Sequence, residues 1–408
     1  MSDPPKVARP LTALFVAEVV STTGSEMAAI ALPWFVLITT GSPARMGLVM
    51  AAEFAGMAVF GVPSGHVATS LGPRRTMLAS DLLRAPLVAL IPALHWAGLL
   101  TFPVLLAVGL AVGAFFPAYS ASQLMVVADL VGDDETRMTR VGGLLGSVNE
   151  TASFVGPAFG GLLVALIGPA QVLLVDAASF VVAFGLVAAF VPVVRRREAE
   201  ERGRVLDGLR YVVRNGPLRR RVAGAAIVQV GFTAMVATLP VAALRRYGAG
   251  AGLAGWLLAA FGGGQVVAGL LSSRARSAGD RTASFALLGV AAATWPLVFV
   301  LPAWGVGVAV AADGLCTGLF YVRFFASLTV RTPPAIRARA MTAVTTTISA
   351  AGPLGFVGAG LLLHGANSVT PGFVLVAAAA TVGATIVATA RVATPTPSIA
   401  GSSSADGE

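Results

Sequence analysis

Acidic side chains that lie inside otherwise apolar stretches are the residues of this sequence best suited to chemistry. A carboxylic acid in apolar surroundings holds its proton more tightly than in water, and its ionised form attracts cations. Such groups can therefore bind and release protons or hold a positively charged ligand. Seven of the 19 acidic residues are of this kind: Glu18, Glu26, Glu53, Asp81, Glu150, Asp176 and Asp313.

The first apolar stretch carries four polar residues at the spacing i, i+4, i+7 and i+8, namely Glu18, Thr22, Ser25 and Glu26. This spacing places them on one face of a helix. If the helix enters the membrane near Leu11, Glu26 lies about 22 Å deep and Glu53 about 10 Å below the opposite surface. We expect these two carboxylates to share an outward-facing pocket in which protons and a cationic substrate compete. The alternative is a structural hydrogen bond between helices.

Other polar residues lie at membrane depth. Asn149 and Glu150 lie about 13 Å into the stretch 141–167, and Asp313 has a similar depth in the stretch 304–328. We expect each of them, like Glu18, either to contribute to coupling or binding or to make a structural contact. Charges at such depth are costly and usually face a cavity or a partner.

Asp81 and Arg84 follow each other at the spacing i and i+3. Side chains at this spacing are neighbours on a helix, which favours a structural ion pair over a moving gate. Asp176 lies near the end of its apolar stretch and is predicted to make a structural polar contact.

The composition excludes a soluble protein. Apolar residues make up 56% of the chain and charged residues 12%, and the net charge is +9. The single cysteine, Cys316, excludes intramolecular disulfides, and the three histidines are scattered. Neither a metal-ligand pattern nor a nucleotide-binding loop is present. We therefore predict no metal, no cofactor and no catalytic residue, and we regard a membrane-embedded enzyme or a non-transporting sensor as the least favoured class.

The apolar stretches are long and lack the alternation of barrel strands, so the elements that position these residues are transmembrane helices. The predicted fold is an all-α integral membrane protein with twelve transmembrane helices in two pseudo-symmetric six-helix bundles. The twelve predicted spans are 11–38, 46–68, 76–97, 102–127, 141–167, 170–192, 222–244, 252–272, 283–302, 304–328, 340–364 and 370–391.

Basic residues set the predicted topology. Most of the 28 lysines and arginines fall in loops on one side, which places both termini and the central loop in the cytoplasm. Five regions are predicted: the N-terminus 1–10, the N-terminal bundle 11–192, a basic linker 193–221, the C-terminal bundle 222–391 and a disordered tail 392–408. The segment 1–10 and the long first span do not suit a cleavable signal peptide.

The linker has an amphipathic segment, since Val205, Leu209, Val212 and Val213 share one helical face among arginines. This pattern favours a short helix on the anionic membrane surface, with a solvated basic linker as the alternative.

Three short sequence segments of the first half resemble three segments of the second half, in the same order. The pairs are Gly72-Pro73-Arg74-Arg75-Thr76 with Gly279-Asp280-Arg281-Thr282, Gly113-Ala114-Phe115-Phe116 with Gly318-Leu319-Phe320-Tyr321, and Gly156-Pro157 with Gly352-Pro353. A duplicated six-helix unit is the basis for alternating access, in which one bundle rocks against the other.

The sequence Gly156-Pro157-Ala158-Phe159-Gly160-Gly161, with Gly143 thirteen residues before Gly156, resembles the antiporter motif of proton-coupled drug exporters in the major facilitator superfamily. One glycine of that motif is replaced by Ala152. The resemblance implies a small-residue face that seals this helix against the other bundle, with Pro157 bending the helix. Ordinary packing is the alternative.

Several further segments are similar to the macrolide-exporter-like branch of the superfamily: Gly24-Ser25-Glu26-Met27, Ser80-Asp81-Leu82-Leu83-Arg84-Ala85, Asp176-Ala177-Ala178-Ser179-Phe180 and Gly208-Leu209-Arg210-Tyr211. The loop before Arg74 and Arg75 departs from the superfamily pattern, because Thr69 and Ser70 replace the usual acidic and basic pair. The charge relay of the cytoplasmic gate is therefore weaker here or supplied elsewhere, with Asp81 and Arg84 as candidates.

The resulting hypothesis is a secondary active transporter in the plasma membrane that exports amphipathic small molecules, such as an antibiotic or a secreted metabolite, by proton antiport. A facilitator-type importer that couples uptake to protons is the alternative on the same fold. The expected partners are the substrate, protons and membrane lipids, without nucleic acid, and we expect a monomer. The helical linker and the basic loops account for the positive charge.

Overall fold

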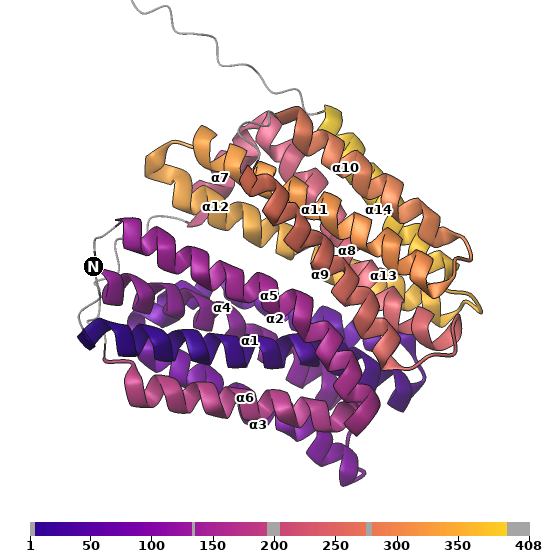
Figure 1. Ribbon diagram of the computed structural model, residues 1–408, viewed down its shortest axis with the longest axis horizontal. Helices are drawn as coiled ribbons and strands as arrows, with labels where there is room; N and C mark the ends of the chain where they lie inside the picture. The colour runs from indigo at the N-terminus through magenta and orange to yellow at the C-terminus, as the bar shows by residue number, and fades with distance from the viewer. Residues whose placement is uncertain (1–4, 133–134, 194–204, 275–279, 390–408) are drawn as a thin grey trace, which may run out of the picture.

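The computed structural model of the chain describes residues 5–132, 135–193, 205–274 and 280–389 (Figure 1). Within these ranges the chain is helical between short connections, and no strand is present. The helices are α1 (Pro5–Thr40), α2 (Pro43–Leu71), α3 (Pro73–Trp96), α4 (Phe102–Val131), α5 (Glu135–Ile167), α6 (Pro169–Phe190), α7 (Val205–Arg214), α8 (Gly216–Arg245), α9 (Ala251–Arg274), α10 (Asp280–Thr294), α11 (Ala303–Arg331), α12 (Pro334–Ser349), α13 (Gly352–His364) and α14 (Thr370–Thr389).

Local sequence signals fix many of the helix starts. Pro43 and Pro169 occupy first turns, where the missing N–H breaks no intrahelical bond. Ser42 caps α2, because its hydroxyl accepts a hydrogen bond from the Arg45 N–H at 3.3 Å. Only Gly72 connects α2 to α3, at a φ of +88° that glycine adopts readily. These signals confine the connections to a few residues.

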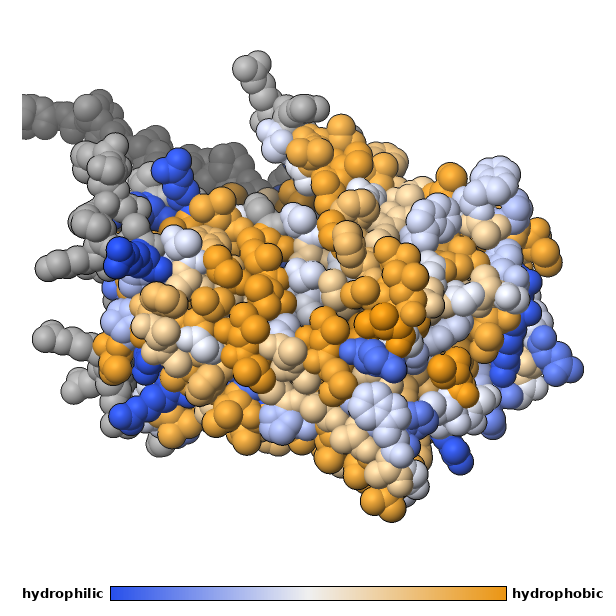
Figure 2. Space-filling model, turned by 60° about the horizontal axis from the view of Figure 1, so that its bottom comes forward, coloured by the Kyte–Doolittle hydropathy of each residue, from blue (hydrophilic) through white to orange (hydrophobic). Residues whose placement is uncertain are grey.

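The surface of the helices suits a bilayer. In the described part of the chain, ten helical segments are long and apolar enough to cross a membrane, and two further apolar segments, Phe154–Ile167 and Ala283–Val298, are shorter. Figure 2 shows apolar side chains over much of one face, with hydrophilic side chains gathered mostly toward its left and right ends. Such a distribution is expected where lipid tails surround the middle of a protein and water surrounds its ends.

The helices form two bundles: α1–α6 form the lower bundle in Figure 1, and α8–α14 form the upper bundle. The same kind of close contact between helices occurs within each bundle. In the first bundle, Gly113 of α4 lies directly against the backbone of Glu53 on α2. In the second bundle, Gly314 of α11 lies directly against the backbone of Phe261 on α9. Glycine permits both approaches because it has no side chain to separate the helices.

The bundles touch mainly at one end of the molecule, which we call the closed end, where Gly47 of α2 packs against Phe356 of α13 and Gly161 of α5 packs against Gly255 of α9. Figure 1 shows the bundles converging there, on the right, and diverging on the left, toward α7 and the N-terminus. We call that opposite end the linker end.

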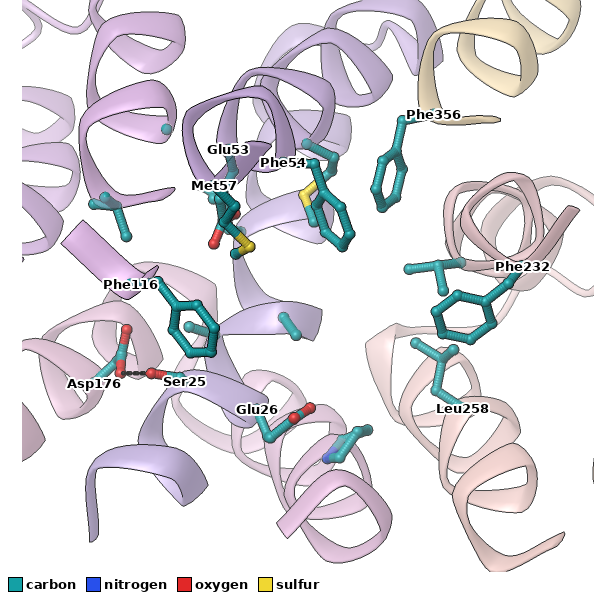
Figure 3. Close-up of a pocket in the computed structure, with 18 of the residues that line it drawn as sticks. Ser25, Glu26, Glu53, Phe54, Met57, Phe116, Asp176, Phe232, Leu258 and Phe356 are labelled. Atoms are coloured by element: carbon teal, nitrogen blue, oxygen red, sulfur yellow. Dashed lines mark hydrogen bonds between the residues drawn. The ribbon is translucent and has the colours of Figure 1, made fainter. Parts of the chain in front are cut away.

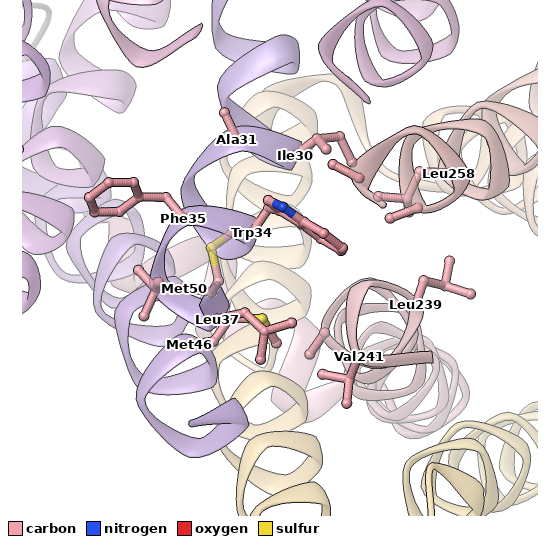
Figure 4. Packing of buried hydrophobic residues seen from close by; sticks show 14 of the residues in the cluster. Ile30, Ala31, Trp34, Phe35, Leu37, Met46, Met50, Leu239, Val241 and Leu258 are labelled. Carbon is pink, nitrogen blue, oxygen red and sulfur yellow. The ribbon is translucent and has the colours of Figure 1, made fainter. Parts of the chain in front are cut away.

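A hydrophobic cluster reinforces the closed end. Figure 4 shows Trp34 of α1 directed toward Leu258 of α9 and the neighbouring α8. Phe35 and Met46 are 1% and 0% exposed in the same cluster. Burial of Trp34 between α1, α8 and α9 stabilises the contact between the bundles, whereas Phe35 points to the other side and packs against His95 of α3.

The predicted span 340–364 corresponds to the apolar segment Arg339–His364, which the structure divides into two helices. The chain turns at Ala350 and Ala351 between α12 and α13. Pro353 in the first turn of α13 has no N–H to donate, so the preceding turn cannot continue the helical bonding. The Thr233 hydroxyl of α8 donates a hydrogen bond to the Gly352 carbonyl at 2.9 Å and links α8 to the start of α13.

The linker helix forms where the sequence predicts it, but its apolar face is divided. Val212 is buried, and Gly208 lies directly against the backbone of Arg339 on α12. Leu209 and Val213 remain 42% and 50% exposed. The side chain of Val205 and the tail 392–408 lie outside the described part of the chain. The helix therefore packs on the second bundle and leaves the other half of its apolar face uncovered.

Candidate binding cavity

A cavity of about 530 Å³ lies between the two bundles, and its two walls differ in chemistry (Figure 3). Acidic side chains come from the first bundle: Glu26 of α1, Glu53 of α2 and Asp176 of α6. The second bundle contributes mainly apolar side chains, among them Phe232 of α8, Leu258 of α9 and Phe356 of α13. This volume and this apolar lining with few polar groups are typical of small-molecule sites.

The pocket expected to contain both Glu26 and Glu53 exists, and both carboxylates line it. Whether it faces outward, as expected, depends on the predicted topology. By the predicted topology the outside is the closed end, where α2 begins, and there Gly47 and Gly360 bring α2 and α13 together. Contact at that end leaves the pocket no outward opening.

Asp176 belongs to this cavity, although the sequence indicated only a structural contact. Its side chain is 3% exposed, and the Ser25 hydroxyl donates a hydrogen bond to its Oδ1 at 3.5 Å (Figure 3). Gly24 brings α1 directly against Ser179 of α6, which places Ser25 beside Asp176. Ser25 lay on the predicted polar face of the first helix, and that pattern was the signal for this partnership.

The predicted ion pair between Asp81 and Arg84 is wrong in this conformation. Among the described residues, neither carboxylate oxygen of Asp81 has a hydrogen-bond partner. The Arg84 guanidinium carbon instead lies 4.0 Å from the centre of the Phe180 ring, a cation–π contact. Arg84 also lines the cavity, and it is the cationic side chain there.

The remaining polar residues of α1 face away from the cavity, toward α4 and α5. The Gln123 side chain donates a hydrogen bond to the carboxylate of Glu18. The Thr22 hydroxyl lies 3.2 Å from Glu18 Oε1 and 3.4 Å from Asn149 Oδ1, and it can donate to either. Glu150 belongs to α5, but its side chain lies outside the described part of the chain.

Asp313 lies apart from the other candidates, inside the second bundle. It is 4% exposed and accepts a hydrogen bond from the Thr317 hydroxyl at 3.2 Å. Thr317 lines the cavity whereas Asp313 does not. Asp313 can therefore act on the cavity only through Thr317.

The glycine motif of α5 has two faces, which the sequence did not separate. Gly156 and Gly160 lie directly against Glu26 and Met27 of α1, within the same bundle. Gly161 is the motif glycine that meets the other bundle, since an added methyl group would lie 2.8 Å from the Ala251 carbonyl oxygen of α9.

Pro157 lies on the side of α5 that faces the other bundle, because its carbonyl touches Gly255 of α9. A methyl group at Gly143, in contrast, would meet no atom of another helix within 4 Å. The expected seal between the bundles is therefore built by Pro157 and Gly161, and Gly156 shapes the position of Glu26.

The loop candidates have structural partners. Arg74 donates from Nε to the Val191 carbonyl and from Nη2 to the Ala188 carbonyl, both at 2.7 Å, and so caps the end of α6. Arg75 is exposed. The Ser70 hydroxyl donates to the Val67 carbonyl of its own helix at 3.1 Å. Arg74 thus holds two helices of one bundle together.

Sequence comparison identifies the family. A family described as transmembrane secretion effectors, of the major facilitator superfamily, matches residues 5–406. The chain belongs to this family. It is 25% identical over 375 residues to the multidrug efflux pump Tap of Mycobacterium tuberculosis, which covers 88% of each protein. It is 30% identical over 178 residues to the multidrug efflux pump Tap of Mycolicibacterium fortuitum, 42% of each protein.

Solved structures confirm the predicted fold. The nucleoside transporter NupG matches with a TM-score of 0.75 and 12% identity, over 93% of this chain and 99% of that chain. A D-xylose–proton symporter matches with a TM-score of 0.73 and 12% identity, over 92% of this chain and 96% of that chain. The protein is a multi-pass membrane transporter of the major facilitator superfamily and not an enzyme.

Proposed function

We propose that this member of the family is a proton-coupled exporter of amphipathic small molecules, and that positively charged compounds are its preferred substrates. The cavity with one acidic and one apolar wall carries the proposal. Glu26, Glu53 and Asp176 attract a cation from one side, while Phe232 and Phe356 bury an apolar group from the other. A compound that has both features satisfies both walls at once.

The orientation follows from the basic loops, which place both termini and the linker end in the cytoplasm of a cell with this protein in its plasma membrane. The structure is then closed toward the outside, and the cavity collects substrate from the cytoplasmic side. Alternating access requires that the contacts of Gly47 and Gly161 separate in the opposite state. The transporter acts as a monomer surrounded by lipid.

Proton coupling rests on competition in the cavity. A proton on Glu26 or Glu53 removes the charge that holds a cationic substrate, so protons and substrate displace each other. Entry of a proton from outside then drives release of the substrate there. The similarity to multidrug efflux pumps of mycobacteria supports export, at 25% identity over most of the chain.

Ethidium, an amphipathic fluorescent cation, tests this function. Cells that express the protein should accumulate less ethidium than control cells, and a protonophore should abolish the difference. Glu26→Gln should abolish proton-driven efflux at wild-type expression, whereas Asp129→Asn, a carboxylate change on α4 outside the cavity lining, should not.

The direction of transport decides between the exporter and the importer. Higher ethidium accumulation in expressing cells, lowered by a protonophore, would show uptake and refute export. Wild-type efflux by Glu26→Gln would remove Glu26 from the mechanism and leave Glu53 and Asp176 as the coupling candidates.

A further inference from the structure

A second group of polar side chains lies inside the first bundle, beside the cavity, and we call it the polar chamber. All are between 0% and 7% exposed. They come from three helices, and the Gln123 side chain donates a hydrogen bond to Glu18 within the group. The chamber consists of Glu18 of α1, Asp81 and Arg84 of α3, and Tyr119, Ser122 and Gln123 of α4.

Several atoms of the chamber have unused hydrogen-bonding capacity. Among the described residues, both carboxylate oxygens of Asp81, the hydroxyls of Tyr119 and Ser122 and the Nε of Arg84 have no hydrogen-bond partner. Buried polar groups are costly without partners, and an ionised carboxylate without one is costlier still. A space with so many donors and acceptors suits water molecules, each of which can join two to four of them. The same argument favours a proton on Asp81.

The position of Arg84 agrees with a neutral Asp81. One turn separates the two residues on α3, a spacing at which their side chains can pair. Arg84 instead stacks on Phe180 of α6, with its guanidinium carbon 4.0 Å from the ring centre. Arg84 lines the cavity together with Glu53 of α2 and Asp176 of α6. Arg84 therefore has two possible arrangements, and the proton on Asp81 selects between them.

A line of polar groups leads from the chamber to an exposed side chain of α5. Glu18 belongs to the chamber and lies 3.2 Å from the Thr22 hydroxyl. Thr22 in turn lies 3.4 Å from Asn149 of α5, whose side chain is exposed. The nearby glycines Gly142 and Gly146 have open space around them. On the other side, Arg84 forms the boundary between the chamber and the cavity.

We propose that Asp81 is a further coupling carboxylate beside Glu26 and Glu53, and that its proton leaves through the polar chamber to the exposed Asn149 of α5, separately from the substrate. The O–H bond of Asp81 breaks, and the proton passes through water to Glu18 and onward past Thr22 and Asn149. The Arg84 guanidinium then leaves Phe180 and pairs with the new Asp81 carboxylate, so this carboxylate is not left unpaired.

Arg84 links this step to the substrate cavity, because its charge moves away from Glu53 and Asp176 when it pairs with Asp81. Those two carboxylates then attract a cationic substrate more strongly. Loss of the proton and binding of substrate thus favour each other, as antiport requires. This inference rests on the proposed proton-coupled export.

Purified protein in liposomes, with ethidium transport driven by an imposed pH gradient, tests the proposal. Asp81→Asn mimics the protonated acid. It should bind ethidium in detergent more weakly than the wild type and lose pH-driven transport, and Asp81→Glu should restore both. Asp129→Asn is the matched control on α4 and should behave like the wild type in both measurements.

Three results would overturn the proposal: pH-driven transport by Asp81→Asn at the wild-type rate, ethidium binding by that variant with wild-type affinity, or transport by the wild type that follows a sodium gradient. Tyr119→Phe serves as a second variant if Asp81→Asn is not monodisperse, because it removes only one hydroxyl of the chamber. It should slow pH-driven transport without changing ethidium binding, and an unchanged transport rate overturns the proposal.

Absence of pH-driven transport in the wild type would refute the proposed function as well, whereas coupling retained by Asp81→Asn refutes the Asp81 path alone.

Discussion

Gly161 on α5 is the position where one methyl group should change the balance between the two states of the transporter. In Gly161→Ala the new Cβ would lie 2.8 Å from the Ala251 carbonyl oxygen and 2.9 Å from the Gly255 Cα, both backbone atoms of α9. Ordinary contact begins at about 3.4 Å, so the helices must separate by several tenths of an ångström. This strain exists only while the bundles touch at the closed end.

Overpacking of a well-packed contact costs about 1–3 kcal/mol. If the open state relieves all of it, the ratio of closed to open should fall by about 5- to 150-fold. Electron–electron distance measurements can detect such a shift. Spin labels on Ile38→Cys and Leu362→Cys, both exposed near the closed end, in a Cys316→Ser background, should show a longer distance in Gly161→Ala.

Two other glycines of α5 provide the controls. In Gly160→Ala the new Cβ would also lie 2.8 Å from backbone, but from Met27 of α1 in the same bundle. It should lower thermal stability without changing the distance distribution. Gly142→Ala, with no atom of another helix within 4 Å, should change neither. The same distribution in Gly161→Ala and the wild type, or the same shift in Gly160→Ala, would refute the role assigned to the contact between the bundles.

Three further predictions follow from single contacts. Gly208→Val would place a side chain against the Arg339 carbonyl and should release α7 from α12, which limited proteolysis of the linker would show as faster cleavage. Thr233→Val removes the donor to the Gly352 carbonyl and should destabilise the protein by about 1 kcal/mol, with a lower Tm; an unchanged Tm would contradict it. Phe232→Ala shortens the apolar wall and should weaken ethidium binding measured by fluorescence, whereas binding at wild-type affinity would exclude this wall from the site.

Hydropathy and charge were sufficient for the fold class, because a bilayer leaves few alternatives. A long apolar stretch in a bilayer must form a helix, because a helix pairs its backbone N–H and C=O groups internally. Basic residues are enriched in cytoplasmic loops, so their distribution indicates the orientation. Helix starts could also be predicted where prolines and caps occur, as at Pro43 and Ser42. The break before Gly352 was missed because hydropathy does not change there, although the Gly-Pro pair was visible in the sequence.

The candidate site was predicted in part. Glu26 and Glu53 were expected in one pocket, and the structure places both there, because depth in the membrane can be counted along a helix. Asp176 was judged a structural residue, since depth alone cannot show which helix lies opposite. The apolar wall with Phe232 and Phe356 had no signal in the sequence, where these residues resemble any lipid-facing aromatic.

The sequence by itself determined that this protein spans a membrane, which types of charge lie inside it and how deep they lie, because those properties depend on local composition and helix rise. Only the tertiary structure decided which partner each charge has. Arg84 could have paired with Asp81 on its own helix, yet the packing of α3 against α6 places it over Phe180. Gly156 and Gly161 belong to one motif, yet a turn of about 100° per residue sends them to different bundles. Partner choice depends on which helices meet, and that is a property of the whole fold.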